Sequence, residues 1–360
     1  MKRPFRRKKE LKKQVTTETI EEHREEVLSK GRKFKYPFQY AKHKLVLNTI
    51  VIGIVAVLLS IGFGWLQLYR FQSTGDILYR FTKVIPVPVA NVDGENVRYS
   101  DYLMIYRSSI MSIEKQKGVL TDSEEDKVMR EQYKRKSLDR AVEFTYALKL
   151  AKELDVEVTQ DQIREAEREH RVVDGVERDE EKFAKIIQTG FGLTVEEYER
   201  LWLLTLTKRE VVVAIDEEAR ATAGEVEALL DGNGGDFSRV VGALGDKVVY
   251  EETGELVSML NLDERRAAMA SSLEVGEWSA RFVPKNGDGY YFLKLLAKSD
   301  GQVKYVSLKV PFGEFDRRMK MIRKEGKVTE YIKVDRIGDD GEMIEAEGIE
   351  IEKDGAVGGG

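Results

Sequence analysis

Residues that could carry out chemistry are scarce in this 360-residue chain. It has no cysteine, which excludes thiol catalysis, cysteine-based metal sites and disulfides. Its three histidines, His23, His43 and His170, are far apart in the sequence. His170 stands among charged residues, which is typical of a helix surface rather than a ligand position. No P-loop, EF-hand, G-x-S-x-G or H-E-x-x-H spacing occurs, so we expect no metal and no cofactor.

Charge is distributed unevenly along the chain. The net charge is -5, yet the residues before Leu45 include fifteen Lys and Arg against six Glu. The remainder is therefore clearly acidic. The pair Glu251-Glu252 and the acidic run from Asp335 to Glu352 could attract cations, although exposed carboxylates are usually just solvated. Nothing here indicates a nucleic-acid-binding surface, and we expect no nucleic-acid partner.

A long uncharged segment follows the basic region. Residues 45–69, LVLNTIVIGIVAVLLSIGFGWLQLY, contain no charge and are long enough to cross a hydrocarbon core of about 30 Å as a helix. Trp65 and Tyr69 stand at its far end, where amphipathic rings favour the headgroup layer. A cleaved signal peptide and a buried core helix are the alternatives, but the segment is too long for the first and lacks the polar face of the second. We therefore predict a transmembrane helix.

The basic flank sets the expected orientation. Lys and Arg next to a span stay on the cytoplasmic side, so residues 1–44 form a basic cytoplasmic tail and the residues after Arg70 are exported. The predicted location is a cell membrane crossed once, with an extracytoplasmic C-terminal body. An exported chain without cysteine fits a bacterial envelope best.

Hydrophobic periodicity divides the exported residues into two modules. Residues 84–214 begin with two short strands joined at Asp93-Gly94 and continue as helices, with capping boxes at Thr159–Gln162 and Thr194–Glu197. Residues 215–334 mix helices with strands, of which Val303–Val310 alternates best. Residues 335–360 form an acidic, Gly-rich tail. The predicted class is α+β, with a helical module, a small α/β module and an antiparallel sheet.

The order of these elements resembles the parvulin-type foldases of the SurA and PrsA group. Three stretches carry the resemblance: VANVDGENVRYSDY, AVEFTYALKLAKELDVEVTQDQI with FGLTVEEYERLW, and GDFSRVVGAL followed by TGELVSM and LEVGEWSARFVPKNGDGYYFLKLL. Together they cover roughly residues 84 to 334. The resemblance implies a SurA N-terminal-like chaperone module and a parvulin (PpiC) domain. The family's first strand has no counterpart before Ala223, and the matching strand comes last.

The resemblance also implies where an isomerase site would lie. Prolyl isomerisation must lower a barrier of about 20 kcal/mol with an apolar pocket and polar groups, which in the family include two histidines. In this chain the histidine positions fall on Tyr291 and Ser307, and the Cys/Asp position falls near Asp246. Leu262 could line the pocket, while an expected aromatic falls near Arg266. Either these residues form a weakened site, or Tyr291 and Ser307 are ordinary sheet residues.

A chaperone would also need an apolar surface for its clients. Met104, Tyr106 and Met111, on the first long helix of the helical module, are candidates, although apolar residues at helical spacing are more often core.

The sequence thus predicts a membrane-anchored extracytoplasmic chaperone that binds unfolded or newly exported polypeptides. The alternatives are an envelope scaffold with one fixed partner and an active isomerase with an altered site. The sequence does not indicate an oligomeric state.

Overall fold

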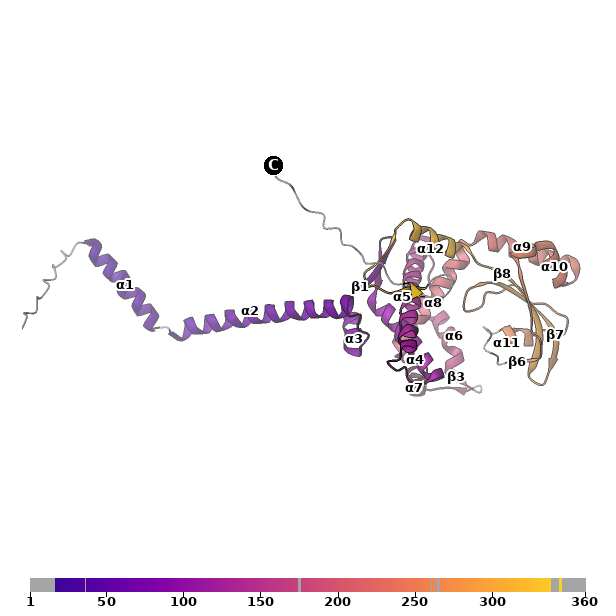
Figure 1. Ribbon diagram of the computed structural model, residues 1–360, viewed down its shortest axis with the longest axis horizontal. Coiled ribbons are helices and arrows are strands. Elements are labelled where there is room, and N and C mark those ends of the chain that lie inside the picture. Colours follow the sequence, from indigo (N-terminus) through magenta and orange to yellow (C-terminus); the bar gives the residue numbers. More distant parts are fainter. Residues whose placement is uncertain are drawn as a thin grey trace, which may run out of the picture. The chain divides into compact units, whose positions relative to one another are not determined.

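The computed structural model describes residues 17–35, 37–173, 176–259, 261, 263, 266–337 and 343–344. The chain divides into two compact units, Met1–Gln67 and Leu68–Gly360. We call the described residues of the second unit the body. Figure 1 labels the α-helices and several of the strands.

The first unit consists of two helices, α1 (Thr17–Lys35) and α2 (Pro37–Trp65). Among the described residues, one helical stretch, Lys44–Arg70, is long and apolar enough to cross a membrane, and its most apolar window has no buried residue. The hydroxyls of Thr49 and Ser60 each donate to the carbonyl four residues earlier, at 2.8 Å. These bonds satisfy the polar groups within the helix, as an apolar surrounding requires.

The body begins at Leu68, within the π-helical turn η1 (Leu66–Arg70). Leu68 is 1% exposed and belongs to the body's largest hydrophobic core. The helices that build this core are α3 (Asp76–Val84), α4 (Tyr99–Lys117), α5 (Glu124–Leu154), α7 (Glu180–Phe191), α8 (Val195–Ile215) and α12 (Glu314–Lys324). The helix α6 (Gln160–Arg171) packs on α8 through a smaller cluster around Ile163 and Leu206. We call this part the helical lobe.

A three-stranded antiparallel sheet joins the two ends of the helical lobe. The hairpin of β1 (Pro88–Val92) and β2 (Glu95–Arg98) turns at Asp93-Gly94, and β9 (Val328–Glu330) pairs with the other edge of β1. Asp93 and Gly94 both have positive φ, 46° and 90°, as the predicted tight hairpin turn requires. Residues more than 230 positions apart thus share one sheet.

Both predicted capping boxes are confirmed. The hydroxyls of Thr159 and Thr194 accept from the backbone N–H groups of Gln162 and Glu197, at 3.3 Å each. The side chains of Gln162 and Glu197 accept in return from the two threonine N–H groups. These reciprocal bonds satisfy donors that a helix start leaves free, so α6 and α8 begin where the sequence predicts.

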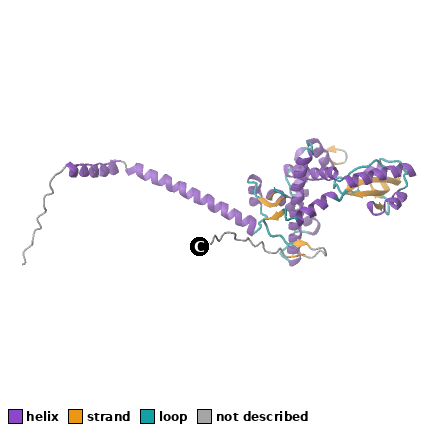
Figure 2. Cartoon of the chain, turned by 90° about the horizontal axis from the view of Figure 1, so that it is seen from above, coloured by secondary structure: helices purple, strands orange, loops and turns teal. Residues whose placement is uncertain are grey.

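The second part of the body, residues 216–313, is the α/β lobe. Its four-stranded antiparallel sheet has β8 at the centre, with β7 along one edge and β5 and β6 along the other. Figure 2 shows strands gathered in this lobe, apart from those of the small sheet. The elements are α9 (Glu217–Asn233), α10 (Phe237–Leu244), η2 (Gly245–Lys247), β5 (Val249–Glu252), β6 (Val257–Ser258), α11 (Arg266–Ser271), β7 (Gly289–Ser299) and β8 (Gln302–Pro311).

Each face of this sheet has its own core. Phe292, Leu308 and Val310 pack with residues of α9 and α10. Leu293 and Leu295 belong to the other core, which includes Ala267 and Ala270 of α11. Successive residues of a strand point to opposite faces, so the two cores use alternate positions of β7 and β8. The predicted α+β class with an antiparallel sheet is confirmed.

The lobes of the body differ from the predicted boundaries at two places. The predicted helical module begins at residue 84, yet Leu68, within the predicted span, and Tyr79 of α3 belong to its core. The sequence assigns residues 314–334 to the second module, yet Phe315, Met319 and Ile332 belong to the core of the helical lobe. The α/β lobe is therefore inserted between α8 and α12, and the chain crosses between the lobes twice. Two short hairpins, β3–β4 (Val172–Val173 and Val176–Glu177) and β10–β11 (Arg336–Ile337 and Met343–Ile344), complete the described structure.

Candidate functional site

Tyr291 and Ser307 lie on the same face of the α/β sheet. Tyr291 on β7 pairs with Lys309 on β8, and Ser307 pairs with Leu293. Cross-strand partners share a face, and so do residues two apart on one strand. The register thus brings together the two positions that the family resemblance indicates.

Both side chains are nevertheless covered. Tyr291 is 5% exposed and Ser307 is 1% exposed. Burial, followed by the charge of Asp288, raises the pKa of the Tyr291 phenol, whose hydroxyl donates to Asp288 Oδ2 at 3.2 Å. The phenol is therefore a neutral donor that already has an acceptor. Neither residue offers a free polar group to a substrate.

Charged side chains surround Tyr291. The Arg266 guanidinium lies 5.5 Å from the ring centroid and donates to Glu251 at 3.0 Å. The Lys309 ammonium lies 5.7 Å from the same centroid and pairs with Asp288. Arg266 thus occupies, as a cation–π partner, the region where the family pattern suggested an aromatic. Sequence reasoning missed Lys309, although it lies two residues after Ser307 on β8 and therefore on the same face of the sheet.

The other residues predicted for this site are not brought to it. Asp246 is exposed in η2 and makes no hydrogen bond to Tyr291 or Ser307 in the described part of the chain. Leu262 lies outside the described residues. The predicted Tyr291, Ser307 and Asp246 set is therefore not assembled as one hydrogen-bonded group.

Two of the three candidate client-binding residues on α4 lie in the core. Met104 and Tyr106 are buried among the residues of the helical lobe, and Met104 borders a small cavity of about 150 Å³ next to Glu197. Met111 is half-buried and faces Gly192, where an added Cβ would lie 3.3 Å from its Cε. Met104 and Tyr106 thus match the alternative that apolar residues at helical spacing belong to the core.

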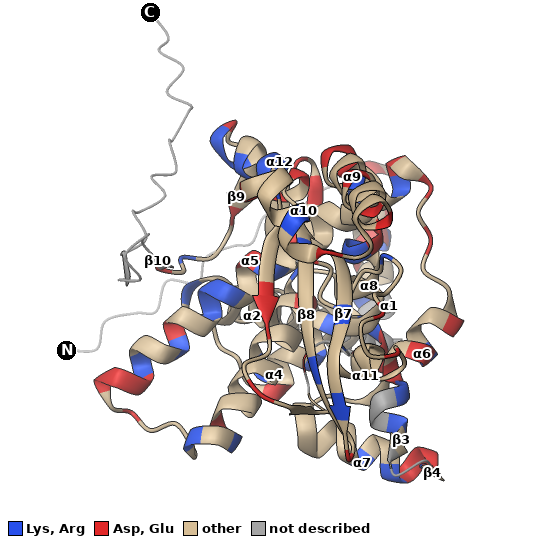
Figure 3. Cartoon of the chain, turned by 90° about the vertical axis from the view of Figure 1, so that its right-hand side faces the viewer, with Lys and Arg blue, Asp and Glu red and all other residues tan. Residues whose placement is uncertain are grey.

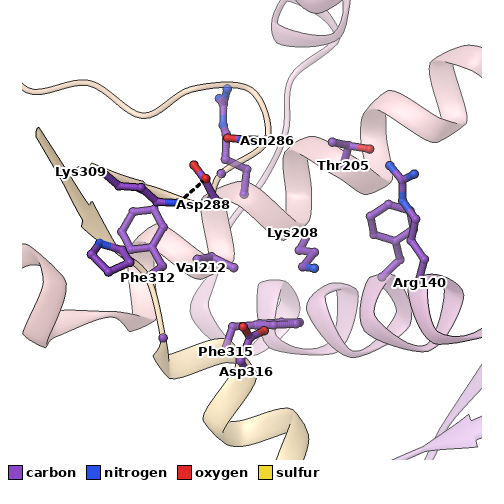
Figure 4. Close-up of a pocket in the computed structure, with 15 residues that line it drawn as sticks. Arg140, Thr205, Lys208, Val212, Asn286, Asp288, Lys309, Phe312, Phe315 and Asp316 are labelled. Carbon is purple, nitrogen blue, oxygen red and sulfur yellow. Dashed lines mark hydrogen bonds and ion pairs between the residues drawn. The ribbon is translucent and has the colours of Figure 1, made fainter. Parts of the chain in front are cut away.

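A larger cleft opens where the two lobes meet. Its volume is about 480 Å³, and its walls come from α5, α8, the loop before β7, the end of β8 and the start of α12. Figure 4 shows Arg140, Thr205 and Lys208 on the helical side and Asn286, Asp288 and Lys309 on the sheet side. We call this cavity the interlobe cleft.

The interlobe cleft combines aromatic rings with cations. Phe144 and Phe315 are buried at its base and Phe312 is half-buried beside them. The Arg140 guanidinium lies 5.1 Å from the Phe144 centroid, and the Lys208 ammonium lies 5.1 Å from that of Phe315. A cation over an aromatic face is stabilised by the ring quadrupole, and its N–H groups that point away from the ring remain free to donate hydrogen bonds.

Most of the cleft's cations already have carboxylate partners. Lys208 binds Glu143 at 2.6 Å, Arg209 binds Glu210 at 2.5 Å, and Lys309 binds Asp288. Arg140 is exposed and, within the described ranges, no carboxylate lies within ion-pair distance of it. Its donors are therefore available for the carbonyl or carboxylate oxygens of a ligand.

Asp288 links the cleft to the sheet face. It lines the cleft and accepts hydrogen bonds from both Tyr291 and Lys309. Figure 3, which looks onto the α/β lobe, shows basic positions along β7 and β8.

The interlobe cleft thus offers apolar rings, free donors and cations. This combination suits an extended polypeptide better than a small substrate in a closed pocket.

Residues 38–207 match the sequence model of the SurA-like N-terminal domain, which is just under half of the chain. The match supports a chaperone of the SurA and PrsA type, and domains of this kind are extracytoplasmic and bind unfolded polypeptides. It begins at the start of α2 and ends within α8, so the parvulin likeness of the α/β lobe stays a prediction. No curated protein matches the chain.

Proposed function

We propose that this protein is a membrane-anchored extracytoplasmic chaperone that binds unfolded polypeptides in the interlobe cleft. The observation that carries the proposal is the cleft itself, about 480 Å³ with an aromatic base and a free Arg140, at the edge of the lobe that matches the SurA-like domain. Aromatic surface takes up apolar side chains, and the cations take up backbone carbonyls and acidic groups.

The proposed anchor is the part of residues 45–69 that precedes Leu68, a residue of the body's core, with the basic residues 1–44 on the cytoplasmic side. The apolar helical stretch Lys44–Arg70 and the extracytoplasmic character of the family support this topology. Anchoring would hold the cleft close to newly exported chains and raise the rate at which it captures them.

The α/β lobe would serve binding rather than catalysis. It contains no histidine, and the burial of Tyr291 and Ser307, together with the hydrogen bond from the Tyr291 hydroxyl to Asp288, favours a structural role for both. An isomerase with an altered site is the alternative, since the two residues do share one sheet face. A scaffold with one fixed partner is the other alternative.

A matched pair of charge reversals tests the cleft. The full chain in lipid nanodiscs is titrated with a fluorescent, permanently unfolded client, and suppression of client aggregation is followed by light scattering. Arg140→Glu should weaken client binding several-fold, about 1 kcal/mol, because it replaces the free donor with a carboxylate. Arg239→Glu, on the exposed outer face of α10, is the control and should bind like the parent. Equal binding by both variants would place the client elsewhere.

A proline-limited refolding assay separates binding from catalysis. We expect the full chain to leave the slow phase unchanged. Acceleration that Tyr291→Phe and Ser307→Ala abolish would instead show a working isomerase. One tight, stoichiometric partner with no holdase activity would favour the scaffold.

A further inference from the structure

The helix α3 carries an exposed apolar face. Ile77, Phe81 and Val84 are 85%, 39% and 82% exposed, and they follow the i, i+4, i+7 spacing of one helix side. The opposite side carries the buried Tyr79 and Thr82. The helix therefore packs on the body with one side and presents a second apolar side outward.

A basic residue flanks this apolar face. Arg80 is exposed next to the stripe, and no ion pair to it occurs in the part of the chain that the structure describes. Ile85, directly after the helix, extends the apolar surface. A short helix with an apolar stripe bordered by a free cation is typical of segments that lie in a membrane interface.

Three bonds hold α3 rigidly to the body. The Tyr79 hydroxyl donates to Glu197 Oε1 at 2.8 Å, and the Lys83 ammonium binds the same oxygen at 3.0 Å. At the other end of the helix, Asp76 pairs with Arg107 at 2.5 Å. Any surface that binds the outer side of α3 therefore fixes the orientation of the whole helical lobe.

The position of α3 in the chain indicates which surface that is. About twenty residues of the uncharged segment suffice to cross the hydrocarbon core, so a span that begins at Leu45 ends near Gly64. Leu68, only four residues later, is already in the core of the body. On the proposed anchor, the body is therefore tethered within a few residues of the headgroups, and α3 begins eight residues after Leu68. Figure 1 shows α3 at the edge of the body.

We propose that α3 is an interfacial helix that docks the body on the outer leaflet of its own membrane. Ile77, Phe81 and Val84 enter the boundary between headgroups and acyl chains, and Arg80 lies among anionic headgroups. This inference rests on the proposed membrane anchor. Its consequence is that the chaperone body has one fixed orientation on the bilayer rather than swinging on a tether.

Depth-dependent quenching tests the proposal, and the absence of native cysteines makes single labels straightforward. The full chain is reconstituted in phosphatidylcholine vesicles containing phosphatidylglycerol, with an environment-sensitive fluorophore on Val84→Cys. Val275→Cys, an exposed valine in the α/β lobe, is the matched control, and Val57→Cys reports insertion of the span. Doxyl-labelled lipids quench from the bilayer and iodide quenches from water.

We expect the lipid quencher to act on the label at 84 and iodide to act on the label at 275. Ile77→Asp should remove the lipid quenching at 84 while leaving that at 57 unchanged. If 57 is quenched by lipid but 84 only by iodide, the docking proposal is overturned and the anchor stands. If neither is quenched by lipid, both the anchor and the docking proposal fail.

Discussion

Asp216 is the residue whose removal should do most damage to the junction between the lobes. It is buried between α8 and α9, and its Oδ1 accepts from the N–H of Ala219 at 2.9 Å, as an N-cap does. Its Oδ2 accepts from the N–H groups of Gly313 and Glu314 at 2.7 and 2.9 Å. One carboxylate therefore ties together both points at which the chain crosses between the lobes.

The magnitude follows from these three bonds. Losing an N-cap costs about 1 kcal/mol, and each of the two half-buried N–H groups that loses its charged acceptor costs about 1–2 kcal/mol. Asp216→Ala should therefore lower the free energy of unfolding by about 3–5 kcal/mol. Asp216→Asn should recover only part of this, because its NH₂ group must face either the Ala219 N–H or the two N–H groups of Gly313 and Glu314.

The assay is urea unfolding of the full chain in a mild detergent, followed by tryptophan fluorescence. Asp236→Ala is the matched control, because Asp236 caps α10 through one bond to Arg239 N–H and should cost only about 1 kcal/mol. Equal losses for the two alanine variants would refute the view that Asp216 clamps the junction.

The pH dependence of the same pair gives a second check. Burial raises the pKa of the Asp216 carboxyl, but the backbone hydrogen bonds lower it by more than burial raises it. The pKa of Asp216 therefore lies below its ordinary value. A lowered pKa in the folded state gives stability that is present above the unfolded-state pKa and is lost as the pH falls through the folded-state pKa. The difference between parent and Asp216→Ala should therefore shrink in acid below about pH 4.

Three further substitutions test other parts of the body by urea unfolding. Arg135→Ala should cost about 3 kcal/mol or more, because it leaves the carboxylate of Glu330 without its bidentate partner; a loss below 1 kcal/mol would contradict this. Glu167→Gln should stabilise the protein at neutral pH, because burial raises the pKa of Glu167 and the folded parent protein loses stability as the pH rises and this carboxyl ionises. The gain should vanish below about pH 4, where the carboxyl is protonated in both states, and a gain that stays constant with pH would contradict this explanation. Gly235→Ala should destabilise by about 1 kcal/mol or more, because its φ is +77° and the new Cβ would lie 2.8 Å from Trp278 Cδ1; an unchanged midpoint would show that the ring moves freely.

The functional residues show where sequence reasoning is limited. The family resemblance directed attention to Tyr291 and Ser307, and the strand register does place them on one face. Their burial could not be predicted from the pattern, because it depends on segments from elsewhere in the chain. The strand β5 pairs with Ser307, and Arg266 of α11 lies over the Tyr291 ring. Arg140 carried no motif at all, since its significance comes from a cleft formed by both lobes.

The sequence alone determined the features whose causes are local. A charge-free stretch of 25 residues defines an apolar helix, the capping boxes place the starts of α6 and α8, and Asp93-Gly94 defines the hairpin turn. Each depends on residues a few positions apart, so periodicity and turn chemistry suffice to predict it.

Only the tertiary structure decided that α12 and β9 return to the first core and that the α/β lobe is an insertion. The apolar spacing of α12 requires a buried face but does not specify which core receives it. That choice is made by contacts between residues hundreds of positions apart, such as the pairing of Ala90 with Glu330. The interlobe cleft, which needs both chain crossings in place, follows from the same choice.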